Sequence, residues 1–217
     1  EGIGDTIRVS LTGNPVDEIP FAKQLADVFG EKGHPNKEDI TRWIKHPFKT
    51  PPRRNRLPAG FDISNYPLVA AEQGTENPSP LPDLIPVDEN SFIKPLNGDM
   101  IRMSANVNDP DEKGVLILKG DSYVDILKGS DAMEKSASVP VIITRDYTGF
   151  DEETTLLRSS VELGGSLLDS SGDGIWIRHR DISPQKLKQL SFGILQASGL
   201  RISSAEGTRS TTTSPSS

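Results

Sequence analysis

Residues 139–197 read VPVIITRDYTGFDEETTLLRSSVELGGSLLDSSGDGIWIRHRDISPQKLKQLSFGILQA, and this segment decides the expected fold. The apolar runs at 139–144 and 175–177 have the length and composition of buried strands. A helix is expected after each run. Asp151 stands before acidic residues in the first turn of one helix, and Ser183-Pro184 marks the start of the other. Strands that alternate with helices at this spacing are typical of βαβ units and a parallel sheet.

Two further strands are expected upstream, at residues 99–104 and 114–118. Near the start of the chain, residues 7–11 alternate between apolar and polar side chains, as a half-buried strand does. Apolar residues then recur at helical spacing up to Phe29, and Gly30 is a fitting end to that helix. Pro20 interrupts the pattern, so either the first turn is separate or the helix begins at Ile19-Pro20. The pair Gly164-Gly165 is expected to break or kink the helix that follows Asp151.

Prolines recur from residue 31 to residue 90, which predicts irregular structure over most of this stretch. A short helix is expected within it at residues 36–45, and Pro47 ends that helix. Residues 203–217 are rich in Ser and Thr and have no apolar face, so we expect a disordered tail. The sequence opens without an initiator Met or a signal peptide, and we therefore expect a segment of a larger protein.

Composition excludes several classes of function. A net charge of −7 argues against nucleic acid as a partner, and no apolar run approaches the ~20 residues of a membrane helix. The absence of cysteine excludes disulfides, thiolate zinc sites and iron–sulfur ligation by this chain, and it fits a cytoplasmic protein. No catalytic triad, paired catalytic carboxylates or glycine-rich phosphate loop has a recognisable spacing. His34 and His46 have no second ligand at metal-binding spacing, so no metal site is expected.

Two stretches carry a family resemblance. EGIGDTIRVSL, at residues 1–11, resembles the last strand of the catalytic barrel in 4-hydroxy-3-methylbut-2-enyl diphosphate synthase, an iron–sulfur enzyme of isoprenoid biosynthesis. GDGIWI at 172–177, followed by LSFGILQA at 190–197, is similar to the strand and helix that precede the cluster-binding cysteines of that family. The long interval between the two matches indicates the large form of the family, which has an extra domain between the barrel and the cluster domain.

The resemblance implies an architecture and a domain organisation. The fold class it implies is α/β, with partial or degenerate TIM-barrel-like βα units and a long irregular Pro-rich segment. Residues 1–30 would be the last strand and helix of the catalytic barrel, and 31–90 a Pro-rich linker. Residues 91–200 would be the inserted α/β domain, and 201–217 a disordered tail. Local sequence signals alone leave open whether the βα units close into a barrel.

The resemblance also implies a role for the segment. The family reductively converts 2-C-methyl-D-erythritol 2,4-cyclodiphosphate to 4-hydroxy-3-methylbut-2-enyl diphosphate at a [4Fe–4S] cluster held by three Cys and a Glu. Its electrons come from ferredoxin or flavodoxin. The segment would be a structural domain between the neighbouring barrel and cluster domains, inactive alone and without catalytic or metal-binding residues. The matching Arg8 and Ser10 would contact the diphosphate of the substrate. Whether residues 214–217, SPSS, stand where the family has its C-P-x-C motif stays open.

Several polar and charged residues could bind a ligand, judged from their side-chain chemistry and their place in the sequence alone. Arg8 and Ser10 face the same way on a strand, as a phosphate-binding pair would. Arg145, Asp146 and Asp151 follow a strand, where a barrel places its site. For His179, between Arg178 and Arg180, we favour a solvated loop over an anion site. We reject calcium at residues 169–174, because Arg180 stands where a bidentate Glu is needed. The basic run suits a solvated linker, or a patch that docks on an acidic neighbouring domain, better than a nucleic-acid arm; it comprises Lys49, Arg53, Arg54 and Arg56.

Two alternatives to the structural domain stay open. The first is a free-standing small α/β enzyme that binds a phosphorylated ligand through Arg8, Ser10 and the loops near Arg145 and His179. The second is an interaction module without enzymatic activity, whose basic Pro-rich stretch docks a partner.

Overall fold

The computed structural model describes residues 16, 18–30, 66–74, 80–88, 91–94, 98, 100–104, 114–134, 139–168 and 171–201. The strand expected at 7–11, the short helix expected at 36–45 and the tail beyond residue 201 lie outside the described residues. Within the described ranges, no helix has both the length and the apolar character needed to cross a bilayer.

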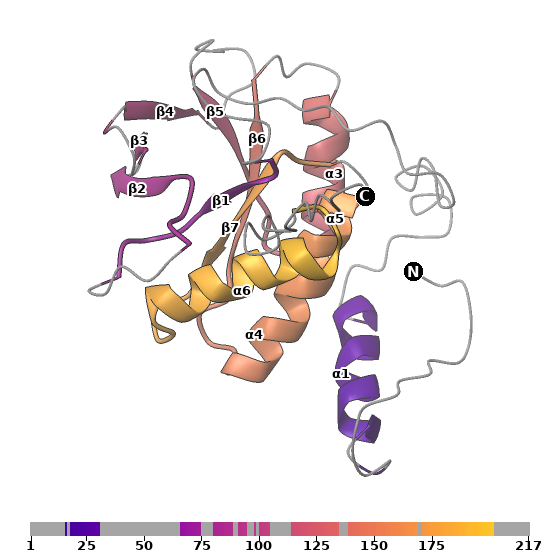
Figure 1. The fold of residues 1–217 in the computed structure, drawn as a ribbon. Helices are drawn as coiled ribbons and strands as arrows, with labels where there is room; N and C mark the ends of the chain where they lie inside the picture. The colour runs from indigo at the N-terminus through magenta and orange to yellow at the C-terminus, as the bar shows by residue number, and fades with distance from the viewer. Residues whose placement is uncertain are drawn as a thin grey trace, which may run out of the picture.

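The described strands form one seven-stranded sheet in the order β1-β7-β6-β5-β4-β3-β2 (Figure 1). The central strands β1, β7, β6, β5 and β4 pair in parallel, whereas β3 is antiparallel to both β4 and β2. The parallel sheet expected from residues 139–197 is therefore confirmed, with β6 and β7 side by side. The strands are β1 Leu68–Ala70, β2 Ile85–Asp88, β3 Ser91–Ile93, β4 Met100–Ser104, β5 Val115–Lys119, β6 Val141–Asp146 and β7 Gly174–Arg178.

The two ends of the sheet meet, so that it forms a nearly closed barrel. Ala70, in β1, makes a parallel bridge with Leu84, which directly precedes β2. The amides of Asp83 and Leu84 donate to the carbonyl of Val69 at 2.9 and 3.2 Å, and the amide of Ala71 donates to the carbonyl of Leu84 at 3.1 Å. These backbone hydrogen bonds between β1 and residues 83–84 form a seam that leaves little unpaired edge.

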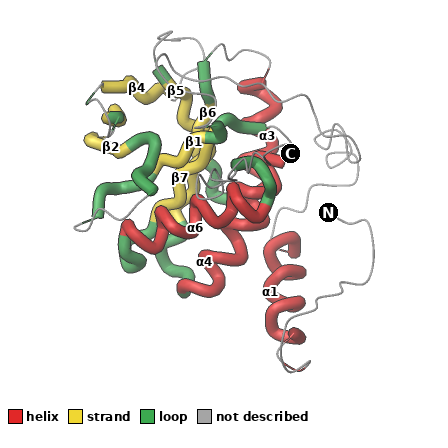
Figure 2. Tube along the Cα trace, in the orientation of Figure 1, coloured by secondary structure: helices red, strands yellow, loops and turns green. Residues whose placement is uncertain are grey.

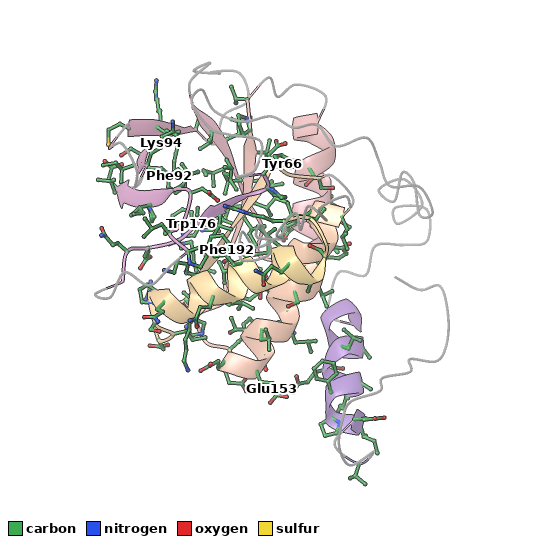
Figure 3. The ribbon with its side chains drawn as sticks, in the orientation of Figure 1. Tyr66, Phe92, Lys94, Glu153, Trp176 and Phe192 are labelled. Carbon is green, nitrogen blue, oxygen red and sulfur yellow. The ribbon has the colours of Figure 1, made fainter. Side chains whose placement is uncertain are left out.

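Side chains of alternate strand residues fill the inside of the barrel. Phe92 of β3 and Trp176 of β7 meet there edge to face, with ring centroids 5.4 Å apart (Figure 3). The inside is therefore a packed core and not a pore, as in other small barrels. Its buried members are Leu68, Ala70, Leu84, Phe92, Ile101, Met103, Val115 and Ile142.

A helical layer lies beside the outer face of the sheet (Figure 2), and a second apolar core packs between the two. The layer contacts β5, β7 and β1, whereas on β4 and β2 the outward-facing Met100 and Val87 are 58% and 55% exposed. Helices thus cover only part of the barrel, as expected for incomplete βα units. The layer comprises α3 Tyr123–Glu134, α4 Glu152–Ser159, the π-helical turn η3 Ser160–Gly164, α5 Gly165–Leu168 and α6 Pro184–Ala197.

The helix boundaries follow the capping signals of the sequence. The side chain of Asp151 accepts a hydrogen bond from the amide of Thr154 at 2.7 Å, and Ser183 caps α6 in the same way. The predicted irregularity at Gly164-Gly165 appears as the π-helical turn between α4 and α5. A Cβ on Gly164 would lie 3.1 Å from Ile194 Cγ2, so the glycine allows α6 to pack closely.

A further helix, α1 (Glu18–Gly30), lies against α4 (Figure 1). Of the two expectations for this helix, the structure agrees with the one that begins near Ile19-Pro20. Pro20 is the third residue of the helix, where its missing N–H is one of the donors that have no intrahelical acceptor.

Two strands of the sheet come from residues 31–90, for which the proline spacing predicted irregular structure over most of the length. β1 has three residues and follows Pro67, and β2 carries Pro86 at the margin of the sheet, where proline is tolerated. Neither strand is long enough to show an alternating pattern. Their strand conformation depends on distant partners, because β1 pairs with β7 and β2 with β3.

Gly174→Ala tests the packing inside the barrel. A Cβ on Gly174 would lie 2.6 Å from the carbonyl oxygen of Leu68 and 2.7 Å from Ile142 Cδ1. We expect the free energy of unfolding in urea to fall by about 1–3 kcal/mol, as in other overpacked cores. Gly193→Ala is the control: its Cβ meets nothing within 4 Å, and we expect unchanged or slightly higher stability. Equal stability of the two variants would contradict the packing described here.

Candidate functional site

The residues with the most specific predicted role are not among those the structure describes. Arg8 and Ser10 lie outside the described residues, as do His34, His46 and the basic run that contains Arg53. The role of Arg8 and Ser10 in substrate binding stays a prediction. The described candidates are those at the carboxyl ends of β5, β6 and β7, where barrel enzymes place their active sites.

Three charged residues end these strands on the side that faces the inside of the barrel. Asp146 of β6 pairs with Arg178 of β7 in the register of the sheet. Each lies two residues after a side chain that faces the inside of the barrel, so each faces the inside as well. Lys119 ends β5 in register with Thr144 of β6 and is exposed. We call Lys119, Asp146 and Arg178 the mouth of the barrel.

Two of the three charges of the mouth, those of Asp146 and Arg178, are engaged by the protein itself. Asp146 Oδ1 accepts a hydrogen bond from the amide of Thr148 at 2.9 Å. Burial raises the pKa of Asp146, but hydrogen bonds from Thr148 and the charges of Arg178 and Arg180 outweigh burial, so that the pKa lies below its usual value. The Arg178 guanidinium carbon stands 5.1 Å from the centroid of the Trp176 ring. A carboxylate held as an anion beside a stacked guanidinium suits a structural role better than proton transfer or anion capture.

His179 does not belong to the mouth. Its Nδ1 accepts hydrogen bonds from the amides of Asp181 and Ile182 at 3.0 and 3.2 Å, which fixes Nε2 as the protonated nitrogen. Nε2 then donates to the carbonyl of Phe150 at 2.9 Å. The ring thus ties the loop after β7 to the loop after β6. The preference for a solvated loop is wrong for this side chain, which is half-buried and fully hydrogen-bonded.

Arg145, Asp146 and Asp151 do not come together. Asp146 faces the mouth and Asp151 caps α4, whereas Arg145 faces the helical layer, on the same side of β6 as Ile143. There Arg145 forms an ion pair with Glu162, a residue of the π-helical turn that is only 1% exposed.

Glu162 is the centre of a buried polar cluster. Tyr147 donates its hydroxyl to Glu162 Oε2 at 2.8 Å, and Arg158 Nη1 lies 3.8 Å from Oε1. The guanidinium of Arg145 lies 5.1 Å from the centroid of the Tyr147 ring, and that of Arg158 lies 4.6 Å from the centroid of Phe150. One carboxylate therefore pairs with two guanidinium groups and accepts a hydrogen bond from one phenol, between β6 and the helix that covers it.

Burial dominates the titration of this cluster. Burial raises the pKa of Glu162, although Arg145, Tyr147 and Arg158 act in the opposite direction. Burial, reinforced by Glu162, raises the pKa of Tyr147 well above 10, so the phenol remains a hydrogen-bond donor. Because the folded chain holds the Glu162 proton more tightly than the unfolded chain, stability falls as pH rises from the usual value of 4.5 to the raised pKa.

Asp173, in the GDG stretch, is another buried carboxylate whose role the sequence did not reveal. Its Oδ1 accepts from the Tyr66 hydroxyl at 3.2 Å, and its Oδ2 accepts from the amide of Val141 at 3.0 Å. The side chain thus joins the start of β7 to the starts of β1 and β6. The only signal in the sequence was an acidic residue between two glycines directly before a buried strand.

The described residues do not offer a metal or cluster site. Among them, no three His, Cys, Asp or Glu side chains gather closely enough to hold an ion. The whole sequence contains no cysteine, so thiolate ligation of an iron–sulfur cluster by this chain does not fit its chemistry.

Glu162→Gln tests the cluster. The substitution keeps the volume of the side chain but replaces one buried acceptor oxygen with an amide donor that faces Tyr147 or Arg145, and we expect the free energy of unfolding to fall by about 1–3 kcal/mol. The fall in stability that begins near pH 4.5 should be absent from the variant. Glu153→Gln, on the exposed side of α4, is the control and should change stability by less than about 0.5 kcal/mol. Equal urea unfolding midpoints for both variants would refute the role given to Glu162.

Comparison with known proteins gives one consistent result. The chain is 28% identical over 260 residues to the 4-hydroxy-3-methylbut-2-en-1-yl diphosphate synthase (flavodoxin) of Parabacteroides distasonis, covering 95% of this chain and 42% of the relative. It is 27% identical to the synthase of the same name from Porphyromonas gingivalis, over 95% of this chain and 39% of the relative. The synthase of Leptospira interrogans is 38% identical over 95 residues, or 43% of this chain.

No family model matches the chain. No solved structure matches it either. The chain spans about two fifths of the length of the first two relatives. Over nearly its whole length, therefore, this chain is similar to a segment of 4-hydroxy-3-methylbut-2-en-1-yl diphosphate synthase, which confirms the resemblance carried by residues 1–11, 172–177 and 190–197.

Proposed function

We propose that this chain is the middle segment of a large-form 4-hydroxy-3-methylbut-2-enyl diphosphate synthase and that its described body is the inserted structural domain. The observation that carries the proposal is the similarity of 95% of the chain to about two fifths of such synthases. The nearly closed barrel supports the view that the insert is a degenerate TIM-like barrel in which hairpin strands replace some βα units.

The mouth of this barrel supports a structural and not a catalytic role. In an active barrel, unengaged polar groups at the strand ends face the substrate. Here Asp146 accepts from Thr148 and Arg178 stacks on Trp176, while Phe92 and Trp176 fill the space beneath them. The domain would hold the preceding catalytic barrel and the following cluster domain at a workable separation.

The parent protein would reductively open 2-C-methyl-D-erythritol 2,4-cyclodiphosphate to 4-hydroxy-3-methylbut-2-enyl diphosphate in the cytoplasm. The [4Fe–4S] cluster, held by three Cys and a Glu, would lie outside this cysteine-free segment. Flavodoxin or ferredoxin would supply electrons to the parent, and the names of the relatives specify flavodoxin. Within this chain, Arg8 would grip the diphosphate through its guanidinium fork and Ser10 through its hydroxyl.

The alternative of a free-standing enzyme for a phosphorylated ligand has less support. It requires several available cations at the strand ends, but Arg178 lies against Trp176 and His179 is committed to backbone partners, which leaves Lys119 as the exposed cation of the mouth. Binding of inorganic diphosphate to this chain, measured by isothermal titration, separates the two hypotheses because only the free-standing enzyme requires tight binding.

The purified chain should not turn over the cyclodiphosphate in the presence of reduced flavodoxin, because it has no cysteine to hold a cluster. The assay follows 4-hydroxy-3-methylbut-2-enyl diphosphate by mass spectrometry, with the full-length parent as the positive control. Product formed by the chain alone would overturn the proposal.

Arg8→Ala in the full-length parent should lower kcat/KM for the cyclodiphosphate by about tenfold to a hundredfold, the loss expected for a charged hydrogen bond to phosphate. Arg102→Ala is the matched control, because Arg102 lies exposed on β4 and should leave kcat/KM unchanged. Lys119→Ala, at the mouth of the inserted domain, should also leave it unchanged. An effect of Lys119→Ala as large as that of Arg8→Ala would show that the mouth takes part in the reaction.

A further inference from the structure

The outer surface of the helical layer carries a groove that the packing of the described residues leaves unfilled. The groove has a volume of about 690 Å³ and runs between α3, the α4-η3-α5 segment and α6. Leu156 and Leu168 lie on its wall, 49% and 50% exposed. Among the described residues that line it, none is charged. An apolar surface of this kind suits the side chains of another helix and not a phosphorylated substrate.

The floor of the groove is made of small residues that the fold itself does not require. Gly193 lies inside α6, where glycine is a poor helix former, yet a Cβ at this position would meet nothing within 4 Å. A Cβ on Gly165 would come no closer than 3.8 Å to the Tyr123 hydroxyl. Gly164 differs, because a Cβ there would lie only 3.1 Å from Ile194 Cγ2. Glycines at such positions allow another backbone to approach closely.

The position of α1 indicates which part of the parent protein would enter the groove. This helix is the one predicted to end the preceding catalytic barrel, and it packs on α4, the helix that contributes Leu156 to the groove (Figure 1). Ile19 of α1 is 67% exposed. The parent would continue well beyond this chain, since the chain spans about two fifths of its relatives. A neighbour of α1 in the preceding barrel would therefore extend the contact between α1 and α4 into the groove.

We propose that the groove receives an amphipathic helix of the preceding barrel domain, next to α1, and that the glycines at positions 165 and 193 let the two helix backbones approach closely. The inference rests on the proposed function, because it needs the parent's barrel as the partner. It adds the surface through which the inserted domain would fix its distance from that barrel. The insert would then be a docked body and not a loosely tethered one.

Hydroxyl-radical footprinting tests the proposal on the 217-residue chain and on the full-length parent. Oxidation of Leu156 and Leu168 should be several-fold lower in the parent than in the chain alone. Met100, on the helix-free face of the barrel and 58% exposed, serves as the reference and should be oxidised equally in both. Equal oxidation of the two leucines in both proteins, or protection of Met100 in their place, would overturn the proposal.

Gly193→Leu sharpens the test, because a Cβ at this position meets nothing within 4 Å and Gly193 lines the groove. In the parent, Gly193→Leu should lower the docking equilibrium constant by about tenfold or more, as expected for an overpacked contact, and restore oxidation of Leu156 and Leu168. Gln196→Leu places the same side chain on an exposed position of α6 outside the groove and should leave both leucines protected. Protection that survives Gly193→Leu would contradict the proposal.

The outcomes separate this inference from the proposed function. A parent that makes 4-hydroxy-3-methylbut-2-enyl diphosphate but leaves both leucines fully oxidised would refute the docking surface alone. A parent without synthase activity would refute the proposed function, whatever the footprint. Leucines protected in the isolated chain at high concentration would identify a second copy as the occupant and also overturn the proposal.

Discussion

The seam between β1 and residues 83–84 is the constraint on which the rest of the structure depends. Asp83 holds it in place: its Oδ2 accepts from the amide of Val69 at 2.8 Å, and its carboxylate receives both terminal nitrogens of Arg201 at 2.5 and 3.1 Å. The Arg201 guanidinium also lies 5.0 Å from the centroid of Phe192, so the segment that follows α6 is tied to the seam. Without this seam, β1 and β2 would be open edges of a sheet.

The domain is organised around a few buried carboxylates at the joints between its elements. Asp83 closes the barrel, Asp173 joins the starts of β1, β6 and β7, and Glu162 fixes the covering helix to β6. Each carboxylate is buried and paired, so that removal of its partner would lower the free energy of unfolding. None of the three lies at the mouth of the barrel. Polar groups placed in this way favour one arrangement of strands and helices, as the proposed structural role would require.

The segment 139–197 could be predicted well because its signals are local: apolar runs, helix caps and a glycine pair act within a few residues of one another. β1 and β2 could not be predicted, because strands of three and four residues are too short to show a periodic pattern. Their strand conformation depends on pairing with residues far along the chain. The same holds for the buried polar contacts between distant parts of the chain. Asp83 and Arg201 are separated by 118 residues, and Tyr66 and Asp173 by 107, so their pairing is invisible to spacing rules. Alternation along β6 does separate Arg145 from Asp146, which face opposite sides of the sheet.

Native-state hydrogen exchange of the amides of Val69, Ala71, Asp83 and Leu84 tests the closed barrel most directly. Each of these four amides donates within the seam. In a closed barrel, we expect these amides to exchange only through the opening that also exposes the amides of the central strand β6, and their protection should be similar. Exchange at the rate of an exposed loop, while β6 stays protected, would show an open sheet and contradict the account.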